Sequence, residues 1–545
     1  MKQSPNPAYA VWTADNGDGT YRNPILYADY SDPDVMRAGD SFYMTASSFN
    51  CVPGLPILHS RDLVNWRLIG HALDRLEPEA VFSAPQHGNG VWAPSIRYHD
   101  GEFRIYWGDP DYGIMLVKAQ KPEGPWTKPL TVLPGKGLID SCPFWDDDGQ
   151  AYLIHAWAAS RCGVKSLLTL RKMNPAGTQT IGEGVHVFDG HDQHHTVEGP
   201  KLYKRDGYYY IFAPAGGVEQ GWQLALRSRE IYGPYEARIV LAQGETGING
   251  PHQGAWVETA HGESWFIHFQ DKGAYGRIAH LQPVQWKNGW PVIGEGGQNG
   301  APGLPVSSFK KPAIHDSAPS CAPATSDEFD QDALGLQWQW HANPAPYWMA
   351  LMRGENRLRL FAVPRPRDAE TFWKIPNLLL QKFPAPAFTV TTRMRLTPET
   401  NGKSAGLIVM GRDYARLSVT YDKDTFSLSL AICRGADRGE PEQIVEQCAL
   451  QPTDQWRRSW TGCAATDWLQ LRLQVAAPNA ECRFSYSLDG EHYAAFDKKF
   501  IAASGVWIGA KVGLFCISAY GAPHGGYADF DWFRVSQSST KIEGE

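Results

Sequence analysis

The chain has 545 residues, with 51 Lys and Arg against 58 Asp and Glu and a formal net charge of −7 at pH 7. This length exceeds the size at which a single hydrophobic core stops growing, so two domains are expected. The acidic balance and the lack of a basic cluster argue against nucleic-acid binding. The sequence also contains no run of about 18 apolar residues, so no membrane-spanning helix is expected.

The N-terminal stretch has no apolar segment of the kind that a secretory signal carries, so we expect a cytoplasmic or periplasmic location for the chain as given. The nine cysteines are odd in number and form no CxxC pair, which argues against a disulfide framework or a zinc cage. Aromatic residues make up 12% of the chain. Sugar-binding proteins and large β-cores both show this enrichment.

Five segments of the first half repeat one pattern, in which a turn containing Gly joins two short strands rich in aromatic residues. Their turns recur at intervals of 48 to 61 residues. Short β-type runs in a repeat of this length predict the blades of a five-bladed β-propeller. The copies are residues 31–44, 93–107, 140–154, 198–212 and 253–267.

Three of the copies open on a carboxylate. Asp32, Asp140 and Glu198 lie seven to nine residues before the turn glycine of their copy. The innermost strands of a propeller begin near the central channel, so these side chains are expected to converge, with Trp92 and His252 in the corresponding places of the other two copies. Carboxylates around a pocket suit glycoside cleavage, which needs a proton donor and a second carboxylate. Each acid taken alone is equally consistent with a turn-forming role.

The composition changes after Gly294. Residues 295–325 are rich in Gly, Pro, Ser and Ala, as in a linker. About a dozen short strands without the blade repeat follow, and their alternation of apolar and polar residues predicts a two-sheet sandwich. We therefore expect a propeller over residues 1–310, a linker over 311–325 and a β-sandwich over 326–545.

Six segments of the first domain resemble, in order, family 43 of the glycoside hydrolases. The second domain resembles the C-terminal sandwich of that family's β-xylosidase-like members, from residues 326–340 to residues 525–535. The resemblance implies an all-β fold, a five-bladed β-propeller followed by a concanavalin-like β-sandwich. The six segments are RNPILYADYSDPDV, GVWAPSIRYHDGEF, IDSCPFWDDDGQAYL, VEGPKLYKRDGYYYIF, GPHQGAWVET and YGRIAHLQPVQW.

The resemblance also implies an inverting mechanism with unequal roles for the three acids. Asp32 of the SDPD segment would be the general base that activates water. Glu198 of the VEGP segment would be the general acid. Asp140 of the LID segment would raise the pKa of Glu198 and orient it.

Four further residues match positions that contact substrate or lie near a metal in the family. Arg277 would bind sugar hydroxyls, and Trp92 and Phe49 would form aromatic walls of the pocket. His252 would lie near a Ca²⁺ ion on the channel axis that is largely water-coordinated, although calcium prefers oxygen ligands. A surface ion pair for Arg277, core packing for the two aromatic residues and a structural role for His252 stay open.

The expected function is that of an inverting exo-glycoside hydrolase. It would release terminal β-D-xylose, α-L-arabinofuranose or both from hemicellulose oligosaccharides such as xylan or xyloglucan fragments. Ca²⁺ is the expected cofactor, no organic cofactor is expected, and a homo-oligomer is compatible with the sequence. A retaining hydrolase of fructosides and a non-catalytic glycan-binding protein are the alternatives.

The second domain offers no carboxylate cluster of its own. Its Gly-rich segment, residues 518–530, resembles a loop that reaches toward the active-site mouth in similar proteins. Such a loop would favour attack on chain ends. Tyr520 or His524 would be the residue that reaches in.

Overall fold

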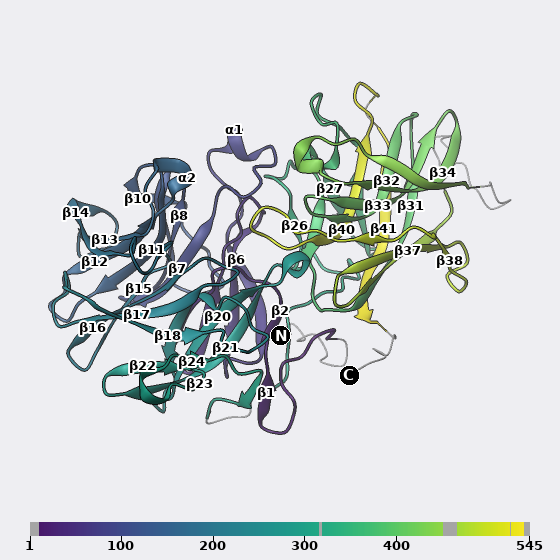
Figure 1. The fold of residues 1–545 in the computed structure, drawn as a ribbon. Helices are drawn as coiled ribbons and strands as arrows, with labels where there is room; N and C mark the ends of the chain where they lie inside the picture. The colour runs from purple at the N-terminus through teal and green to yellow at the C-terminus, as the bar shows by residue number, and fades with distance from the viewer. Residues whose placement is uncertain (1–9, 315–318, 451–465, 524, 539–545) are drawn as a thin grey trace.

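The computed structural model describes residues 10–314, 319–450, 466–523 and 525–538, which form two β-rich lobes (Figure 1). In these residues no helix is long and apolar enough to cross a membrane. The helical segments are short. They are α1 (Glu79–Phe82), α2 (Ala159–Cys162), η2 (Gly273–Tyr275), η3 (Gln298–Gly300), η4 (Phe372–Lys374) and η5 (Ala436–Arg438).

The first lobe is the five-bladed propeller that the repeats predict. Each of its first three blades is a four-stranded antiparallel sheet. Blade 1 contains β3 (Asp34–Ala38), β4 (Ser41–Thr45), β5 (Gly54–Ser60) and β6 (Trp66–Leu73). Blade 2 contains β7 (Trp92–His99), β8 (Glu102–Asp109), β9 (Gly113–Ala119) and β10 (Leu130–Pro134). Blade 3 contains β11 (Leu138–Trp145), β12 (Ala151–Trp157), β13 (Leu167–Met173) and β14 (Thr180–Asp189).

The last two blades carry additional strands. Blade 4 contains β15 (Lys201–Arg205), β16 (Tyr208–Ala215), β17 (Trp222–Ser228) and β18 (Glu236–Ala242), followed by β24 (Gly303–Leu304) and β23 (Glu295–Gly296). Blade 5 contains β19 (His252–Glu258), β20 (Ser264–Asp271), β21 (Arg277–Lys287), β22 (Trp290–Ile293) and β2 (Leu26–Asp29). A separate pair is formed by β1 (Thr20–Arg22) and β25 (Ser308–Lys310).

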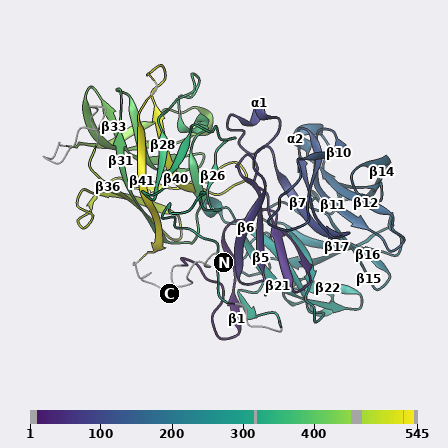
Figure 2. The same ribbon diagram turned by 180° about the vertical axis from the view of Figure 1, so that it is seen from behind.

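The N-terminal strand β2 closes the ring of blades. It pairs antiparallel with β21, and Leu26 lies opposite Ala279. Tyr21 just before it is fully buried and donates its hydroxyl to the carbonyl of Leu281 at 2.8 Å. Blade 5 therefore combines strands from both ends of the propeller sequence, and β2 and β21 are both labelled in Figure 1. Figure 2 shows the same ribbon from behind, with β21 and β22 of this blade and β5 and β6 of blade 1 labelled.

The Asp-Gly turns have the backbone that tight hairpins require. Asp100 and Gly101 have φ of 50° and 77°, and Asp206 and Gly207 have φ of 49° and 74°. Positive φ at both central residues matches the right-handed twist of the flanking strands and favours Asp-Gly. These turns place the strand that follows each of them next to the innermost strand of its blade.

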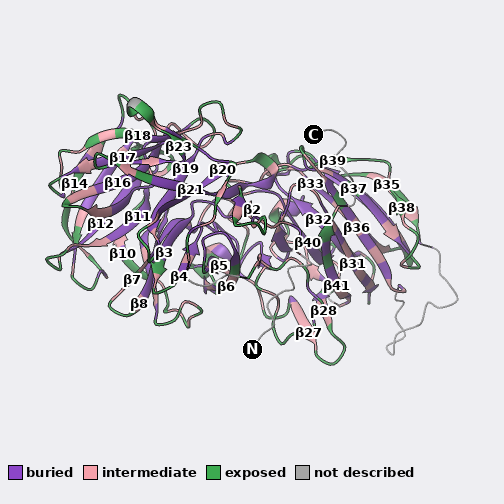
Figure 3. Ribbon diagram, turned by 90° about the horizontal axis from the view of Figure 1, so that it is seen from below, coloured by how far each residue is buried: buried purple, intermediate pink, exposed green. Residues whose placement is uncertain are grey.

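The second lobe is a sandwich of two sheets (Figure 3). In β31 the burial alternates residue by residue from Phe388 to Leu396, as the sequence pattern FTVTTRMRLT predicts. One sheet contains β26 (Gln339–Trp340), β29 (Val363–Pro364), β30 (Leu379–Lys382), β32 (Lys403–Met410), β33 (Tyr414–Asp422), β34 (Thr425–Cys433), β35 (Gln443–Ala449) and β40 (Lys511–Ser518). The other contains β27 (Met349–Met352), β28 (Arg357–Phe361), β31 (Phe388–Thr397), β36 (Leu469–Ala476), β37 (Glu481–Ser487), β38 (Ala494–Ala495), β39 (Phe500–Ile501) and β41 (Tyr527–Gln537).

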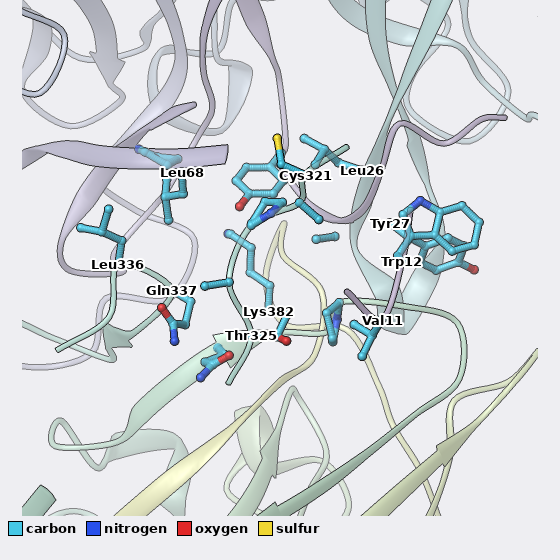
Figure 4. A pocket seen from close by; sticks show the side chains of 18 of the residues that line it. Val11, Trp12, Leu26, Tyr27, Leu68, Cys321, Thr325, Leu336, Gln337 and Lys382 are labelled. Carbon is cyan, nitrogen blue, oxygen red and sulfur yellow. The ribbon is translucent and has the colours of Figure 1, made fainter. Parts of the chain in front are cut away.

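The two lobes pack directly against each other. Val52 of the propeller forms a β-bridge with Trp340 of the sandwich, and Asn343 hydrogen-bonds the backbone of Leu76 in both directions. A crevice at this interface is lined mostly by apolar side chains, and its lining residues include no Asp or Glu. Figure 4 shows Val11, Trp12, Leu26, Tyr27, Leu68, Cys321, Thr325, Leu336, Gln337 and Lys382 around it. The crevice thus belongs to the packing of the lobes, and the carboxylates lie elsewhere.

Candidate active site

Each blade has one residue with positive φ where its innermost strand begins. They are Asp32 (52°), Ala93 (34°), Asp140 (58°), Gly199 (57°) and Gln253 (38°). In blades 2, 3 and 5 the strand register also shifts at this point. A non-glycine residue held at positive φ costs about 1–3 kcal/mol, so its recurrence marks a constrained position at this end of the channel.

This equivalence corrects the predicted register of the three acids. Asp32 and Asp140 occupy the positive-φ position of their blades, whereas Glu198 stands one residue earlier, before Gly199. Glu198 therefore corresponds to His252 and to Trp92 in the other blades. The spacing to the turn glycines, which varies among the copies, could not separate these two positions.

Asp32 is nearly buried and is held by three donors. Its Oδ2 accepts hydrogen bonds from the hydroxyls of Ser31 at 2.7 Å and Ser47 at 2.6 Å. Arg277 Nη1 lies 3.2 Å from its Oδ1. These contacts orient the carboxylate and offset its charge.

Asp140 and Glu198 form an interacting pair of carboxyl groups. Burial of Asp140, together with repulsion from Glu198 and then Asp32, raises the pKa of Asp140 to about 8. The Gly199 amide donates to its Oδ2 at 2.8 Å and acts in the opposite direction. The Glu198 side chain retains 32% exposure, whereas Asp140 is 4% exposed. A pair of this kind titrates as a unit and holds one proton at neutral pH.

His252 lies beside the exposed member of this pair. Its Nε2 is 3.1 Å from Glu198 Oε1, and its side chain is fully buried. Its Nδ1 has no hydrogen-bond partner among the residues that the structure describes. Those residues also include no group of three or more His, Cys, Asp and Glu suited to a metal. The described residues thus provide no identified set of protein ligands for Ca²⁺ near His252, and the calcium site stays a prediction.

The predicted substrate-binding residues surround the carboxylates. Arg277, at the start of β21, is 7% exposed, and its Cζ lies 4.8 Å from the centre of the Phe269 ring. Trp92 is half-buried, and its ring meets the edge of Phe49 at a centroid distance of 6.4 Å. Phe49 is only 2% exposed, so Trp92 offers the larger surface to a sugar.

A residue of the sandwich reaches this site from residues 503–510. Trp507 has 50% of its surface exposed, with its ring centroid 6.3 Å from that of Trp92. Arg277 Cζ lies 5.6 Å from the centre of the same ring. Hydrogen bonds from Gly509 N to Asp29 Oδ2 at 3.1 Å and from Ala510 N to Ala274 O at 2.7 Å anchor the loop to the propeller.

The described part of residues 518–530 gives no support to the prediction that Tyr520 reaches the active-site mouth. Ala519 N bonds the carbonyl of Gly402, and Tyr520 is 61% exposed, so the described part of this segment packs on a turn of its own domain. His524 lies outside the described residues. The sequence missed Trp507, whose signal is a single Trp between two glycines in the run SGVWIG.

The comparisons with known proteins agree with this geometry. The model of Glycosyl hydrolases family 43 matches residues 21–291, and that of the Beta xylosidase C-terminal Concanavalin A-like domain matches residues 326–536. A putative beta-xylosidase of Xylanibacter ruminicola is 37% identical over 93% of this chain and 88% of its own. A non-reducing end alpha-L-arabinofuranosidase of Bacteroides ovatus is 31% identical over 72% of this chain and 74% of its own.

A solved structure shows the same arrangement of both lobes. The xylan beta-1,4-xylosidase of Bacillus halodurans superposes with a TM-score of 0.81 and 25% identity, over 95% of this chain and all of its own. Both family models, the full-length relatives and the arrangement of the carboxylates lead to one assignment. The chain belongs to family 43 of the glycosyl hydrolases.

Proposed function

We propose that this hydrolase removes terminal pentoses from hemicellulose oligosaccharides with inversion at the anomeric carbon. The observation that carries the proposal is the placement of Asp32, Asp140 and Glu198 at one mouth of the propeller channel, with Arg277 beside Asp32. Inverting cleavage needs one carboxylate to activate water and one carboxylic acid to protonate the leaving oxygen.

The surroundings of each acid support the division of roles. Asp32 accepts hydrogen bonds from Ser31 and Ser47 and faces Arg277, which orients it as a carboxylate that takes a proton from water. Glu198 is the more exposed member of the pair that shares a proton, so it can reach a leaving oxygen. Because burial and its neighbours disfavour the charge of Asp140, the pair keeps one proton at neutral pH.

The shape of the mouth supports attack on chain ends. Trp507 enters from the other lobe and packs edge-on against Trp92 at the site. A wall at this position leaves room for a terminal sugar and obstructs a chain that continues in both directions. The anchoring of this loop on Asp29 and Ala274 makes the wall part of the assembled two-lobe protein.

Two pentosides fit the proposal. The relatives described above carry the names beta-xylosidase and alpha-L-arabinofuranosidase, and the former covers more of this chain. β-D-xylosides are therefore the first substrates to test. Parallel turnover of an aryl β-D-xyloside and an aryl α-L-arabinofuranoside, each with and without a chelator, tests both the substrate class and the predicted calcium. No turnover of either would contradict the proposal and favour a glycan-binding protein.

A further inference from the structure

The propeller channel has a second mouth at the end opposite the carboxylates. A hollow of about 520 Å³ opens there, lined by the last residues of all five innermost strands, β3, β7, β11, β15 and β19. Asp32 precedes β3 and Arg37 lies near its end, so five residue steps separate them, at most about 16 Å at roughly 3.3 Å per residue. The volume falls within the range of about 300–1,000 Å³ typical of ligand pockets.

Buried charges close the channel between its two mouths. Asp34 is fully buried, and its Oδ2 pairs with Arg97 Nη1 at 2.6 Å. Lys201, 1% exposed, lies 3.4 Å from Asp34 Oδ1 and donates to Ser95 Oγ at 2.6 Å. Such a network leaves no path for a sugar chain from one mouth to the other, so the hollow is separate from the cleavage site.

Aromatic side chains form much of the wall of this hollow. Tyr98 lies at the end of β7 with 48% of its surface exposed, and the ring of Phe103 packs behind it at a centroid distance of 4.9 Å. Phe144 and Tyr203 line the hollow from the next two blades and are half-buried. Rings held from behind with one accessible side are the surfaces on which sugar rings stack.

The charged groups of the wall balance one another. Arg37 Nε donates to the carbonyl of Glu258 at 3.0 Å, and Lys204 Nζ pairs with Asp147 Oδ2 at 2.8 Å. Each cation of the rim therefore has an acid or a carbonyl beside it, and no excess of either sign attracts an ionic ligand. Paired and oriented polar groups between aromatic rings suit a neutral ligand with many hydroxyls.

We propose that this hollow is a second carbohydrate-binding site, which holds a neutral pentose-rich chain away from the carboxylates. The site goes beyond the proposed function because it retains the polymer without cleaving it. Only the choice of pentose polymer rests on that function. A protein bound to a chain at this mouth stays near further chain ends, which raises their effective concentration at the cleavage site.

The test compares retention of the full chain on insoluble xylan with turnover of an aryl β-D-xyloside. Tyr98→Ala is expected to weaken retention about three- to tenfold, because one aromatic contact is lost. It is expected to leave turnover unchanged. Tyr98→Phe keeps the ring and is expected to retain most binding. Tyr347→Ala, at a Tyr of the sandwich that is 66% exposed, is the matched control and is expected to bind as the unaltered chain does. Thermal unfolding of each variant checks its fold.

The possible results separate this inference from the proposed function. Turnover with retention that does not depend on Tyr98 overturns the second site alone. Retention that depends on Tyr98 without turnover of any pentoside overturns the proposed hydrolysis alone. A change of oligomeric state in Tyr98→Ala, measured by size-exclusion chromatography with light scattering, identifies the hollow as a contact between copies and also overturns the second site.

Discussion

The backbone amide of Gly199 donates a 2.8 Å hydrogen bond to Oδ2 of Asp140. This bond stabilises the ionised form of Asp140, and it comes from the residue that follows Glu198. It therefore opposes the burial and the neighbouring charges that raise the pKa of Asp140, and it fixes this carboxyl next to Glu198. Because residue 199 has φ of 57°, a glycine there lets the chain turn so that its amide faces Asp140.

Replacement of the proposed acid is expected to depend on the leaving group. Glu198→Gln should lower kcat about 10²–10⁴-fold for xylobiose, whose leaving oxygen needs a proton. It should lower kcat much less for a dinitrophenyl xyloside, whose leaving group departs without one. Steady-state kinetics on the two substrates measure the difference. An equal loss on both would remove Glu198 from the role of acid.

The activity profile should have an alkaline limb near pH 8. The pKa of Asp140 is raised to about 8 by burial and by the charges of Glu198 and Asp32, so above this pH the pair loses its shared proton. Asp140→Asn removes the group with the raised pKa, so the limb near pH 8 should shift while kcat falls. The pH dependence of kcat/KM checks both shifts. An unmoved limb would show that this pair does not set it.

Stability should fall as pH rises from about 6.5 to 8. The pKa of Asp140 is higher in the folded chain than its ordinary value of 3.8, so the folded state holds a proton that the unfolded chain releases, and stability decreases through this window. Burial lowers the pKa values of His155 and His268. Their effect on stability therefore falls below about pH 6.5, the pKa of a free histidine, and outside the range from 6.5 to 8.

Variants of Asp140 and Asp109 separate their contributions to the pH dependence of stability. Asp140→Asn should flatten the slope of unfolding free energy against pH, measured in denaturant at several pH values. Asp109, whose burial raises its pKa to about 7, gives the matched variant. Asp109→Asn should flatten only the lower part of the window, and identical slopes for all three proteins would contradict the assignment.

Arg277 is expected to contribute geometry as well as charge. Its Nη1 contacts both Ser31 Oγ at 2.8 Å and Asp32 Oδ1 at 3.2 Å. Arg277→Lys keeps the charge but loses the planar fork, so kcat/KM for an aryl pentoside should fall about 10–10²-fold. A fall of this size cannot come from a surface ion pair, which contributes about 0–1 kcal/mol. Nearly full activity in Arg277→Lys would show that Arg277 contributes only an ion pair.

The propeller and the three acids could be predicted because their signals are local. The Asp-Gly turns recur in the sequence, and the carboxylates stand at nearly constant distances before them. The one-residue offset of Glu198 could not be predicted, since it is visible only in the φ angles of Asp140 and Gly199. Trp507 could not be predicted either, because its place at the mouth depends on how two separate lobes dock through Gly509 and Asp29.

Trp507 should act mainly on binding. Trp507→Ala removes the ring that packs edge-on against Trp92. It should raise KM for short pentosides about three- to tenfold, because one aromatic contact is lost, with a smaller change in kcat. Tyr520→Ala is the control, since Tyr520 is exposed in the same domain and follows Ala519, whose amide bonds the carbonyl of Gly402. If both variants behave alike, the loop over residues 503–510 has no part in the site.

The stereochemistry of cleavage is measured most directly by proton NMR of the first sugar released. With an aryl β-D-xyloside in D₂O, Asp32 and Glu198 acting as base and acid should give α-D-xylose first, with the β-anomer appearing only by mutarotation. Early appearance of β-D-xylose would mean retention. It would require a carboxylate nucleophile and contradict the roles assigned to the three acids.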